Sequence, residues 1–194
     1  GEKFIGKDNI ALILGDNFFY GQSLTNILKK STNLKNGAKI FVHPVKNPNL
    51  YGVATLGKNN KILKLVEKPK KSISNLAVTG LYFFDNQVIR FTKKLKPSKR
   101  GELEITDLNK ILIKKKQIKE LMLNRGNAWM DAGSFQSYLD AANMISVIQK
   151  RQNINIGCIE EIAFRNKWIS KKNLLKLLTK YPDNEYKKYI KSLL

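Results

Sequence analysis

The sequence has one cysteine, Cys158, and one histidine, His43, among its 194 residues. A single cysteine excludes a disulfide framework within the chain, and a single histidine excludes a metal site built from a histidine cluster. The longest uninterrupted apolar runs are about five residues, whereas a membrane-spanning helix needs about 20. We therefore expect a protein without membrane association that works in the reducing environment of the cytoplasm.

Acidic residues are also scarce, since 15 Asp and Glu stand against 36 Lys and Arg and leave a formal net charge of +21. Such an excess prompts the question of nucleic-acid binding, because a basic surface attracts phosphate backbones. Only five of the basic residues are arginine, however, and the lysines are scattered along the chain. Arginine forks and interleaved aromatic residues are the usual means of phosphate and base recognition. We interpret the charge as a general enrichment in solvated lysine, with a basic nucleic-acid-binding protein as the alternative from another functional class.

The start of the chain has the pattern of a parallel α/β unit. Residues 10–14 form a short apolar run that stops at Gly15, which predicts a buried strand. Residues 23–30 predict a helix, and residues 38–45 predict a second strand. This order of strand, helix and strand indicates an α/β fold with a mostly parallel sheet flanked by helices.

The middle of the chain predicts an antiparallel portion of the same sheet. Residues 53–56 and 62–67 have the composition of short strands. Residues 57–60, with the sequence Gly-Lys-Asn-Asn, are typical of a hairpin connection between them. Residues 77–84 form a third apolar strand that contains a glycine.

The last third of the chain is predicted to be helical. A helix that begins at Ser134 and ends near residue 152 carries apolar side chains at helical spacing, which predicts packing in a core. These side chains are Phe135, Tyr138, Leu139, Ala142, Ile145 and Ile148. Residues 153–194 contain three more helix-like segments. We therefore expect two domains, a partial α/β domain over residues 1–152 and a C-terminal helical appendage over residues 153–194.

Two carboxylates directly follow strand-like segments. Asp16 lies in the sequence Leu-Gly-Asp-Asn, and Asp131 precedes the helix that begins at Ser134. Ligands of α/β sheets bind at the carboxyl ends of strands, where carboxylate oxygens can hold a Mg²⁺ ion that also contacts phosphate. The alternative is an ordinary role for each residue, Asp16 in a turn and Asp131 at a helix N-terminus.

Charged residues beside a proline or a glycine are the other candidate binding residues. Glu67-Lys68-Pro69 ends a predicted strand, and Pro69 is expected to hold the backbone of Lys68 extended. Arg100 stands before a glycine at the mouth of a predicted helix, a place that suits a phosphate group. The alternative for both is an exposed charged side chain without a ligand.

Six ordered motifs resemble those of the glucose-1-phosphate thymidylyltransferase family, and together they extend over nearly the whole chain. The motifs are LGDNFFYG at residues 14–21, NLYGV at 49–53, EKP at 67–69, AVTGLY at 77–82, RGELEITD at 100–107 and WMDAG at 129–133. Each motif is weak by itself, whereas six in this order with compatible spacing form a specific signal. The segment CIEEIAFR at residues 158–165 also resembles the C-terminal region of the family.

The resemblance implies an activity and the roles of single residues. The family joins dTTP and α-D-glucose 1-phosphate into dTDP-glucose, a precursor in deoxysugar and dTDP-rhamnose biosynthesis, and releases pyrophosphate. Asp16 and Asp131 would be the catalytic residues that hold Mg²⁺. The residues that would bind the nucleotide-sugar or the sugar phosphate are Asn17, Gly52, Glu67, Lys68, Val78, Arg100 and Trp129.

The resemblance also implies regulation and assembly. The complete enzyme would be a homotetramer, and dTDP-rhamnose would inhibit it at a second, allosteric site between subunits. The segments that would contribute to this site contain Gly21, Arg125, Glu161 and Arg165.

One feature of the family is missing from the sequence. The Gly-x-Gly-Thr-Arg-Leu loop that holds the triphosphate has no counterpart among the 194 residues. His43 and Cys158 offer no substitute chemistry, because neither has a partner for nucleophilic catalysis. We therefore expect an incomplete fragment that retains the sugar-binding half and is inactive alone. Because the base-reading residues belong to the missing part, another sugar-phosphate nucleotidyltransferase, such as a uridylyltransferase, is the alternative within the class.

Overall fold

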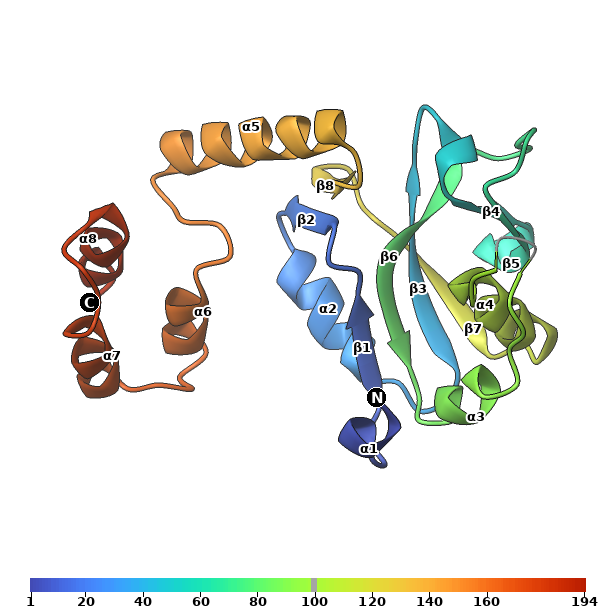
Figure 1. Ribbon diagram of the computed structural model, residues 1–194, viewed down its shortest axis with the longest axis horizontal. Helices are drawn as coiled ribbons and strands as arrows, with labels where there is room; N and C mark the ends of the chain where they lie inside the picture. The colour runs from blue at the N-terminus through green and yellow to red at the C-terminus, as the bar shows by residue number, and fades with distance from the viewer. Residues whose placement is uncertain (99–100) are drawn as a thin grey trace. The chain divides into compact units, whose positions relative to one another are not determined.

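The computed structural model describes residues 1–98 and 101–194, so the predicted site residue Arg100 lies outside the described residues. The described residues form two compact units, Gly1–Ser134 and Phe135–Leu194 (Figure 1). The strands belong to the first unit, and the second unit is helical. The predicted division into domains after residue 152 stays a prediction.

A six-stranded mixed sheet forms the centre of the first unit (Figure 1). Its strand order is β5-β4-β6-β3-β7, and β1 also pairs with β6. β3 and β7 pair in parallel, whereas the other described pairs of this sheet are antiparallel. The strands are β1 (Ile10–Ile13), β3 (Ala38–Pro44), β4 (Gly52–Leu56), β5 (Ile62–Glu67), β6 (Leu76–Phe84) and β7 (Ile118–Met122).

The predicted strand-helix-strand unit is present, but its two strands are not neighbours. β1 and β3 both pair antiparallel with β6, so they run in the same direction on either side of it. Ile10 and Ala38 are both register partners of Phe84. β6 takes this central place because most of its apolar side chains are buried on both faces. The pairing is therefore mixed, where the order of elements alone predicted mostly parallel neighbours.

The hairpin predicted in the middle of the chain is confirmed. β4 and β5 pair antiparallel, with Gly52 opposite Glu67, and the short helical turn η2 (Lys58–Asn60) connects them. Asn59 and Asn60 have positive φ angles of 58° and 57°, a conformation that asparagine tolerates better than most residues. The turn thus depends on the asparagines that made the segment recognisable.

The prediction that the strand over residues 10–14 is buried is wrong, because its side chains are exposed. Leu12, Ile13 and Leu14 are 37%, 56% and 40% exposed. The reason is that β1 pairs only with β6 in the part of the chain that the structure describes, which leaves an apolar edge in solvent.

Helices cover both faces of the sheet. α2 (Leu24–Thr32) packs on one face, whose buried side chains are Phe41, Leu81, Phe83 and Leu123. α3 (Val88–Thr92) and α4 (Ile105–Lys114) pack on the other face, whose buried side chains include Ile40, Val42, Tyr82 and Phe84. Neighbouring residues of β3 and β6 therefore point to opposite faces, as the two-residue period of a strand requires. The short elements α1 (Glu2–Ile5) and η1 (Pro48–Leu50) complete this unit.

A separate two-stranded sheet joins distant parts of the first unit. β2 (Asn17–Gly21) pairs antiparallel with β8 (Asn127–Asp131), so that Asn17 lies opposite Asp131 and Phe19 lies opposite Trp129. The pairing places the motifs LGDNFFYG and WMDAG side by side, although they are far apart in the sequence.

The second unit consists of α5 (Phe135–Gln152), α6 (Ile159–Arg165), α7 (Lys171–Leu178) and α8 (Glu185–Ser192). Its core contains Cys158, Leu174, Leu178 and Ile190, so the packed thiol is structural. The prediction that the apolar stripe of α5 packs in a core is wrong within this unit, because Phe135, Tyr138 and Leu139 are exposed and only Ala141 of this helix is buried. Among the described residues, no helix combines the length and the apolarity that crossing a bilayer demands.

Candidate active site

The two predicted metal-binding carboxylates, Asp16 and Asp131, lie side by side. A side-chain carbon placed on Gly133 would be 2.9 Å from Asp131 Oδ1 and 3.4 Å from Asp16 Oδ2. The backbone holds them there, because Gly133 N donates to Asp131 Oδ1 at 2.8 Å and Ala132 N donates to the Asp16 carbonyl oxygen at 2.7 Å. Both carboxylates therefore border the same small space beside Gly133, and only a residue without a side chain leaves that space open.

Asn17 connects the carboxylates to the main sheet. Its Nδ2 donates to Asp16 Oδ1 at 2.8 Å. Its Oδ1 accepts from Gly80 N at 2.9 Å and from Trp129 Nε1 at 2.6 Å. A side-chain carbon on Gly80 would lie 2.5 Å from Asn17 Cγ, which no real contact allows. Gly80 is thus a site residue that the sequence analysis missed, and the signal was a glycine inside an otherwise apolar strand.

Two aromatic rings contact the indole of Trp129. The Tyr51 ring lies 5.0 Å from the indole with an interplanar angle of 62°, and the His43 ring lies 6.3 Å away at 76°. Edge-to-face contacts of this kind fix the orientation of an aromatic side chain. Burial, together with the negative charge of Asp131, raises the pKa of the Tyr51 hydroxyl. The carboxylates, the indole and Tyr51 therefore belong to one site.

Glu67 is held at the end of β5, opposite Gly52. Thr106 Oγ1, on the first turn of α4, donates to Glu67 Oε2 at 2.5 Å. A side-chain carbon on Gly52 would lie 3.1 Å from Glu67 Oε2 and 3.2 Å from Thr106 Oγ1, so the glycine gives this pair room. Burial and then the charge of Glu67 raise the pKa of the Tyr82 hydroxyl. Thr106 could not be singled out from the sequence, because it carries no signal beyond its place in a family motif.

The expectation that Pro69 holds Lys68 extended is wrong. Lys68 has a φ of 37°, in the left-handed region that a residue with a side chain rarely adopts. The turn is stabilised because Lys68 N donates to the Tyr51 carbonyl oxygen at 3.0 Å. It leaves the Lys68 side chain exposed while Glu67 is half-buried. Backbone strain of this kind is concentrated at functional sites.

The other predicted residues are distributed over both units. Val78 is half-buried on β6 and faces Val42 of β3 in register. Gly21 and Arg125 lie in the first unit, and a side-chain carbon on Gly21 would be 2.3 Å from Asn127 Nδ2.

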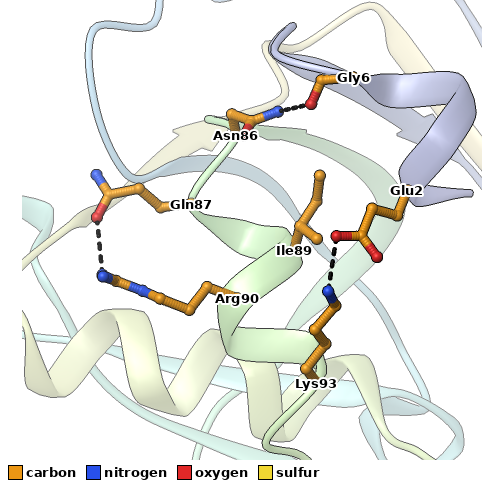
Figure 2. Close-up of a pocket in the computed structure, with 7 residues that line it drawn as sticks. All are labelled: Glu2, Gly6, Asn86, Gln87, Ile89, Arg90 and Lys93. Atoms are coloured by element: carbon orange, nitrogen blue, oxygen red, sulfur yellow. Dashed lines mark hydrogen bonds and ion pairs between the residues drawn. The ribbon is translucent and has the colours of Figure 1, made fainter.

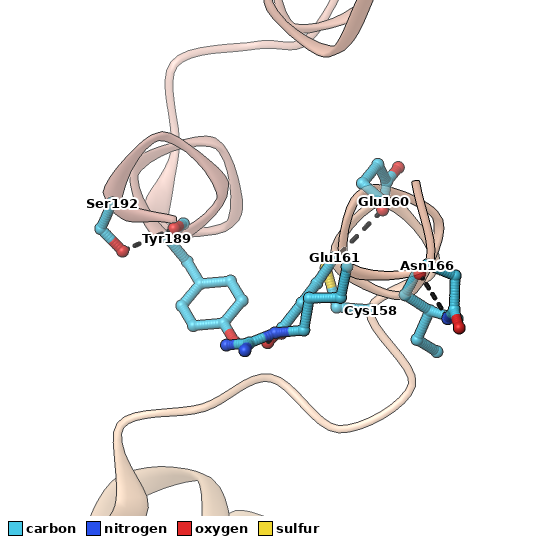
Figure 3. A network of polar contacts seen from close by, with 8 residues as sticks. Cys158, Glu160, Glu161, Asn166, Tyr189 and Ser192 are labelled. Atoms are coloured by element: carbon cyan, nitrogen blue, oxygen red, sulfur yellow. Dashed lines mark hydrogen bonds and ion pairs between the residues drawn. The ribbon is translucent and has the colours of Figure 1, made fainter. Parts of the chain in front are cut away.

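Glu161 and Arg165 lie in the second unit, one turn apart on α6. Arg165 Nε is 2.6 Å from Glu161 Oε1. The Tyr189 hydroxyl of α8 donates to the other oxygen of Glu161 (Figure 3). The two residues of the predicted allosteric site on α6 therefore contact each other.

A pocket elsewhere in the first unit contains none of the predicted site residues (Figure 2). Lys93 Nζ is 2.6 Å from Glu2 Oε1, and Asn86 Nδ2 donates to the Gly6 carbonyl oxygen at 2.9 Å. These interactions connect α1 to α3 (Figure 2). The polar groups of this pocket pair with each other, which is typical of a structural contact.

The chain belongs to the nucleotidyl transferase family, which its residues 1–147 match. Within this family it is similar to glucose-1-phosphate thymidylyltransferases. It is 45% identical to the enzyme of Neisseria meningitidis serogroup A over all 194 residues, which are 67% of that protein. It is 47% identical to the enzyme of Neisseria gonorrhoeae over 90% of this chain and 60% of that protein. The chain thus spans two thirds or less of the length of these relatives.

Solved structures confirm the nucleotidyltransferase-like α/β fold. A Bacillus anthracis protein assigned as a glucose-1-phosphate thymidylyltransferase, in complex with a sucrose, superimposes with a TM-score of 0.67 at 38% identity, over 80% of this chain and 59% of that one. A UDP-glucose pyrophosphorylase complexed with UDP-glucose gives a TM-score of 0.65 at 28% identity, over 74% of this chain and 58% of that one. The higher identities favour the thymidylyltransferase interpretation over a uridylyltransferase or a nucleic-acid-binding protein.

Proposed function

We propose that this chain provides the sugar-phosphate side of a glucose-1-phosphate thymidylyltransferase. The complete reaction joins dTTP and α-D-glucose 1-phosphate into dTDP-glucose and pyrophosphate. The observation that carries the proposal is the convergence of Asp16, Asn17, Trp129 and Asp131 on one site, in a chain 45% identical to such an enzyme.

We propose Asp16 and Asp131 as the residues that hold Mg²⁺. The donor set fits this ion, because Mg²⁺ is bound by one or two carboxylates and keeps its other positions for water and substrate phosphates. Within residues 1–98 and 101–194, no group of three or more His, Cys, Asp or Glu side chains is arranged so that it could hold a metal ion. When bound, the ion neutralises charge on the phosphate oxygens. The hydrogen bonds from Asn17 and Gly133 orient the two carboxylates toward it.

We propose that Glu67 recognises the sugar. Thr106 occupies Glu67 Oε2 and orients the carboxylate, and the other oxygen then accepts a hydrogen bond from a glucose hydroxyl. Gly52 brings its backbone close to the sugar, Val78 lines the site and Trp129 closes it. Lys68 on its strained turn, together with Arg100, binds the phosphate. This division of tasks matches a ligand with a polar ring at one end and a dianion at the other.

In the transfer step, an oxygen of the sugar phosphate attacks the α-phosphorus of dTTP. A new P–O bond forms to the sugar phosphate, and the bond between the α-phosphorus and the bridging oxygen breaks, so that pyrophosphate leaves. Catalysis of this kind depends on positioning and on electrostatic stabilisation. The residues of this chain contribute by holding the attacking phosphate and the metal in place.

We also propose a homotetrameric, cytoplasmic enzyme that supplies dTDP-rhamnose biosynthesis. Gly21, Arg125, Glu161 and Arg165 would bind the inhibitory dTDP-sugar. The hydrogen bond from Arg165 to Glu161 supports this assignment, since the mostly buried carboxylate of Glu161 preorganises the exposed guanidinium of Arg165.

Calorimetric titration with α-D-glucose 1-phosphate in the presence of Mg²⁺ tests the proposal. We expect binding that Glu67→Gln weakens about ten- to hundredfold, because a hydrogen bond to a charged group contributes about 1.5–3 kcal/mol. The matched control is Glu120→Gln, a half-buried carboxylate on β7 at the far edge of the sheet. Absence of binding, or equal affinities for the two variants, would contradict the proposal.

A further inference from the structure

We infer that His43 is a positioning residue that fixes the indole of Trp129 at the proposed sugar site, an inference that rests on the proposed function. The two rings meet edge to face, with centroids 6.3 Å apart and an interplanar angle of 76°. His43 comes from β3 of the main sheet, whereas Trp129 comes from β8 of the two-stranded sheet. The contact therefore joins the two sheets at the indole itself.

The indole is held by one hydrogen bond and two ring contacts. Trp129 Nε1 donates to Asn17 Oδ1 at 2.6 Å, which fixes one point of the ring. The Tyr51 ring, 5.0 Å away, and the His43 ring then restrict rotation about that point. Without His43, one of the two ring contacts is lost and the indole gains freedom to tilt.

A histidine at this position destabilises the fold, which a purely structural role does not explain. Its Nδ1 is buried and has no hydrogen-bond partner among the described residues. An unpaired buried polar atom destabilises a fold, and an aliphatic side chain of similar size would avoid that cost. Burial also lowers the pKa of His43, so the ring is neutral at neutral pH. The ring contact with Trp129 is the aromatic interaction that this histidine makes in the described part of the chain.

Loss of one edge-to-face contact reduces the preorganisation of a binding site by a modest amount. The interaction energy of such a ring pair corresponds to about a two- to tenfold change in an equilibrium constant. We therefore expect variants without a ring at position 43 to bind α-D-glucose 1-phosphate about two- to tenfold more weakly. Trp129 should also become more accessible to a small quencher.

Two substitutions separate the role of the ring from that of the nitrogen. His43→Phe and His43→Leu both remove the buried Nδ1, but only His43→Phe keeps a ring against the indole. Both are made in the full chain carrying Trp168→Phe, so that Trp129 is the only tryptophan left in the sequence. Lys39→Gln is the control on the same strand, since its ammonium group contacts carbonyl oxygens at the end of α2.

Acrylamide quenching of Trp129 fluorescence and a glucose 1-phosphate titration are measured at pH 8. The inference predicts that His43→Leu increases quenching and weakens binding, while His43→Phe and Lys39→Gln match the parent. Equal behaviour of His43→Leu and His43→Phe overturns it, as does an unchanged His43→Leu. If the parent does not respond to glucose 1-phosphate, the proposed function fails, and the quenching comparison still decides whether His43 positions the indole.

Discussion

Substitution of Gly80 by alanine should disconnect the carboxylate site from the main sheet. The new methyl carbon would lie 2.5 Å from Asn17 Cγ, 2.6 Å from Oδ1 and 2.7 Å from Nδ2. Ordinary contacts of this kind are about 3.5 Å or longer, so the amide must move by roughly 1 Å. That movement breaks the bonds from Gly80 N and Trp129 Nε1, and it removes the support of Asp16 Oδ1.

The magnitude follows from these losses. Overpacking costs about 1–3 kcal/mol, and each neutral hydrogen bond contributes about 0.5–1.5 kcal/mol. We therefore expect Gly80→Ala to lower the free energy of unfolding by about 2–4 kcal/mol. With a urea m-value of about 2 kcal/mol/M, the midpoint of unfolding should fall by about 1–2 M.

Urea unfolding and glucose 1-phosphate binding should therefore both change in Gly80→Ala. Gly15→Ala is the matched control, because a side-chain carbon there meets nothing within 4 Å. A double-mutant cycle adds a second test, since Asn17→Ala removes the clashing amide and should cost less in the Gly80→Ala background than alone. An unchanged midpoint, or strictly additive costs, would refute the reasoning.

Three further predictions concern other parts of the chain. Thr106→Val should weaken glucose 1-phosphate binding about tenfold in calorimetry, because Glu67 loses its donor; unchanged affinity would contradict the role given to Thr106. Burial of Glu160 opposes its ionisation, but hydrogen bonds from Tyr181 and Tyr186 outweigh it and lower the pKa of this carboxyl below its usual 4.5. Thermal unfolding should therefore lose stability as the pH falls from about 4.5 through the lower pKa of the folded state, and Glu160→Gln should remove that dependence. Residues 1–194 alone should release no pyrophosphate from dTTP and glucose 1-phosphate above background, because they contain no Gly-rich phosphate loop; robust turnover would mean that another segment binds the triphosphate.

Local features of the fold could be predicted from the sequence because they depend on neighbouring residues. The hairpin of β4 and β5 follows from the asparagines of its turn, and the C-terminal helices follow from their apolar spacing. The place of β6 between β1 and β3 could not be predicted, because strand order depends on which apolar run is buried on both faces. The exposed stripe of α5 has a related cause, since spacing shows that a helix has an apolar face but not what covers it.

Some residues of the candidate site could likewise be predicted from the sequence, whereas others could not. Asp16, Asp131 and Glu67 stand out by residue type and by their place after strands, and the family motifs contain them. Thr106 acts through a contact with one other side chain, which no local pattern reveals. Gly80 carries only the signal of a glycine inside an apolar strand, which does not show that Asn17 is its partner. The rule that a residue before proline is extended fails for Lys68, because a hydrogen bond to the Tyr51 carbonyl stabilises a turn that Pro69 disfavours.

The account depends most directly on whether the metal and the sugar phosphate share the site at Asp16 and Asp131. Phosphorus NMR of α-D-glucose 1-phosphate measures this when Mn²⁺ replaces Mg²⁺, because the paramagnetic ion speeds the relaxation of a phosphate beside it. We expect strong enhancement with the parent chain and with Glu120→Gln, and loss of it with Asp16→Asn and Asp131→Asn. Equal enhancement in the parent and in both Asn variants would place the metal elsewhere and contradict the account.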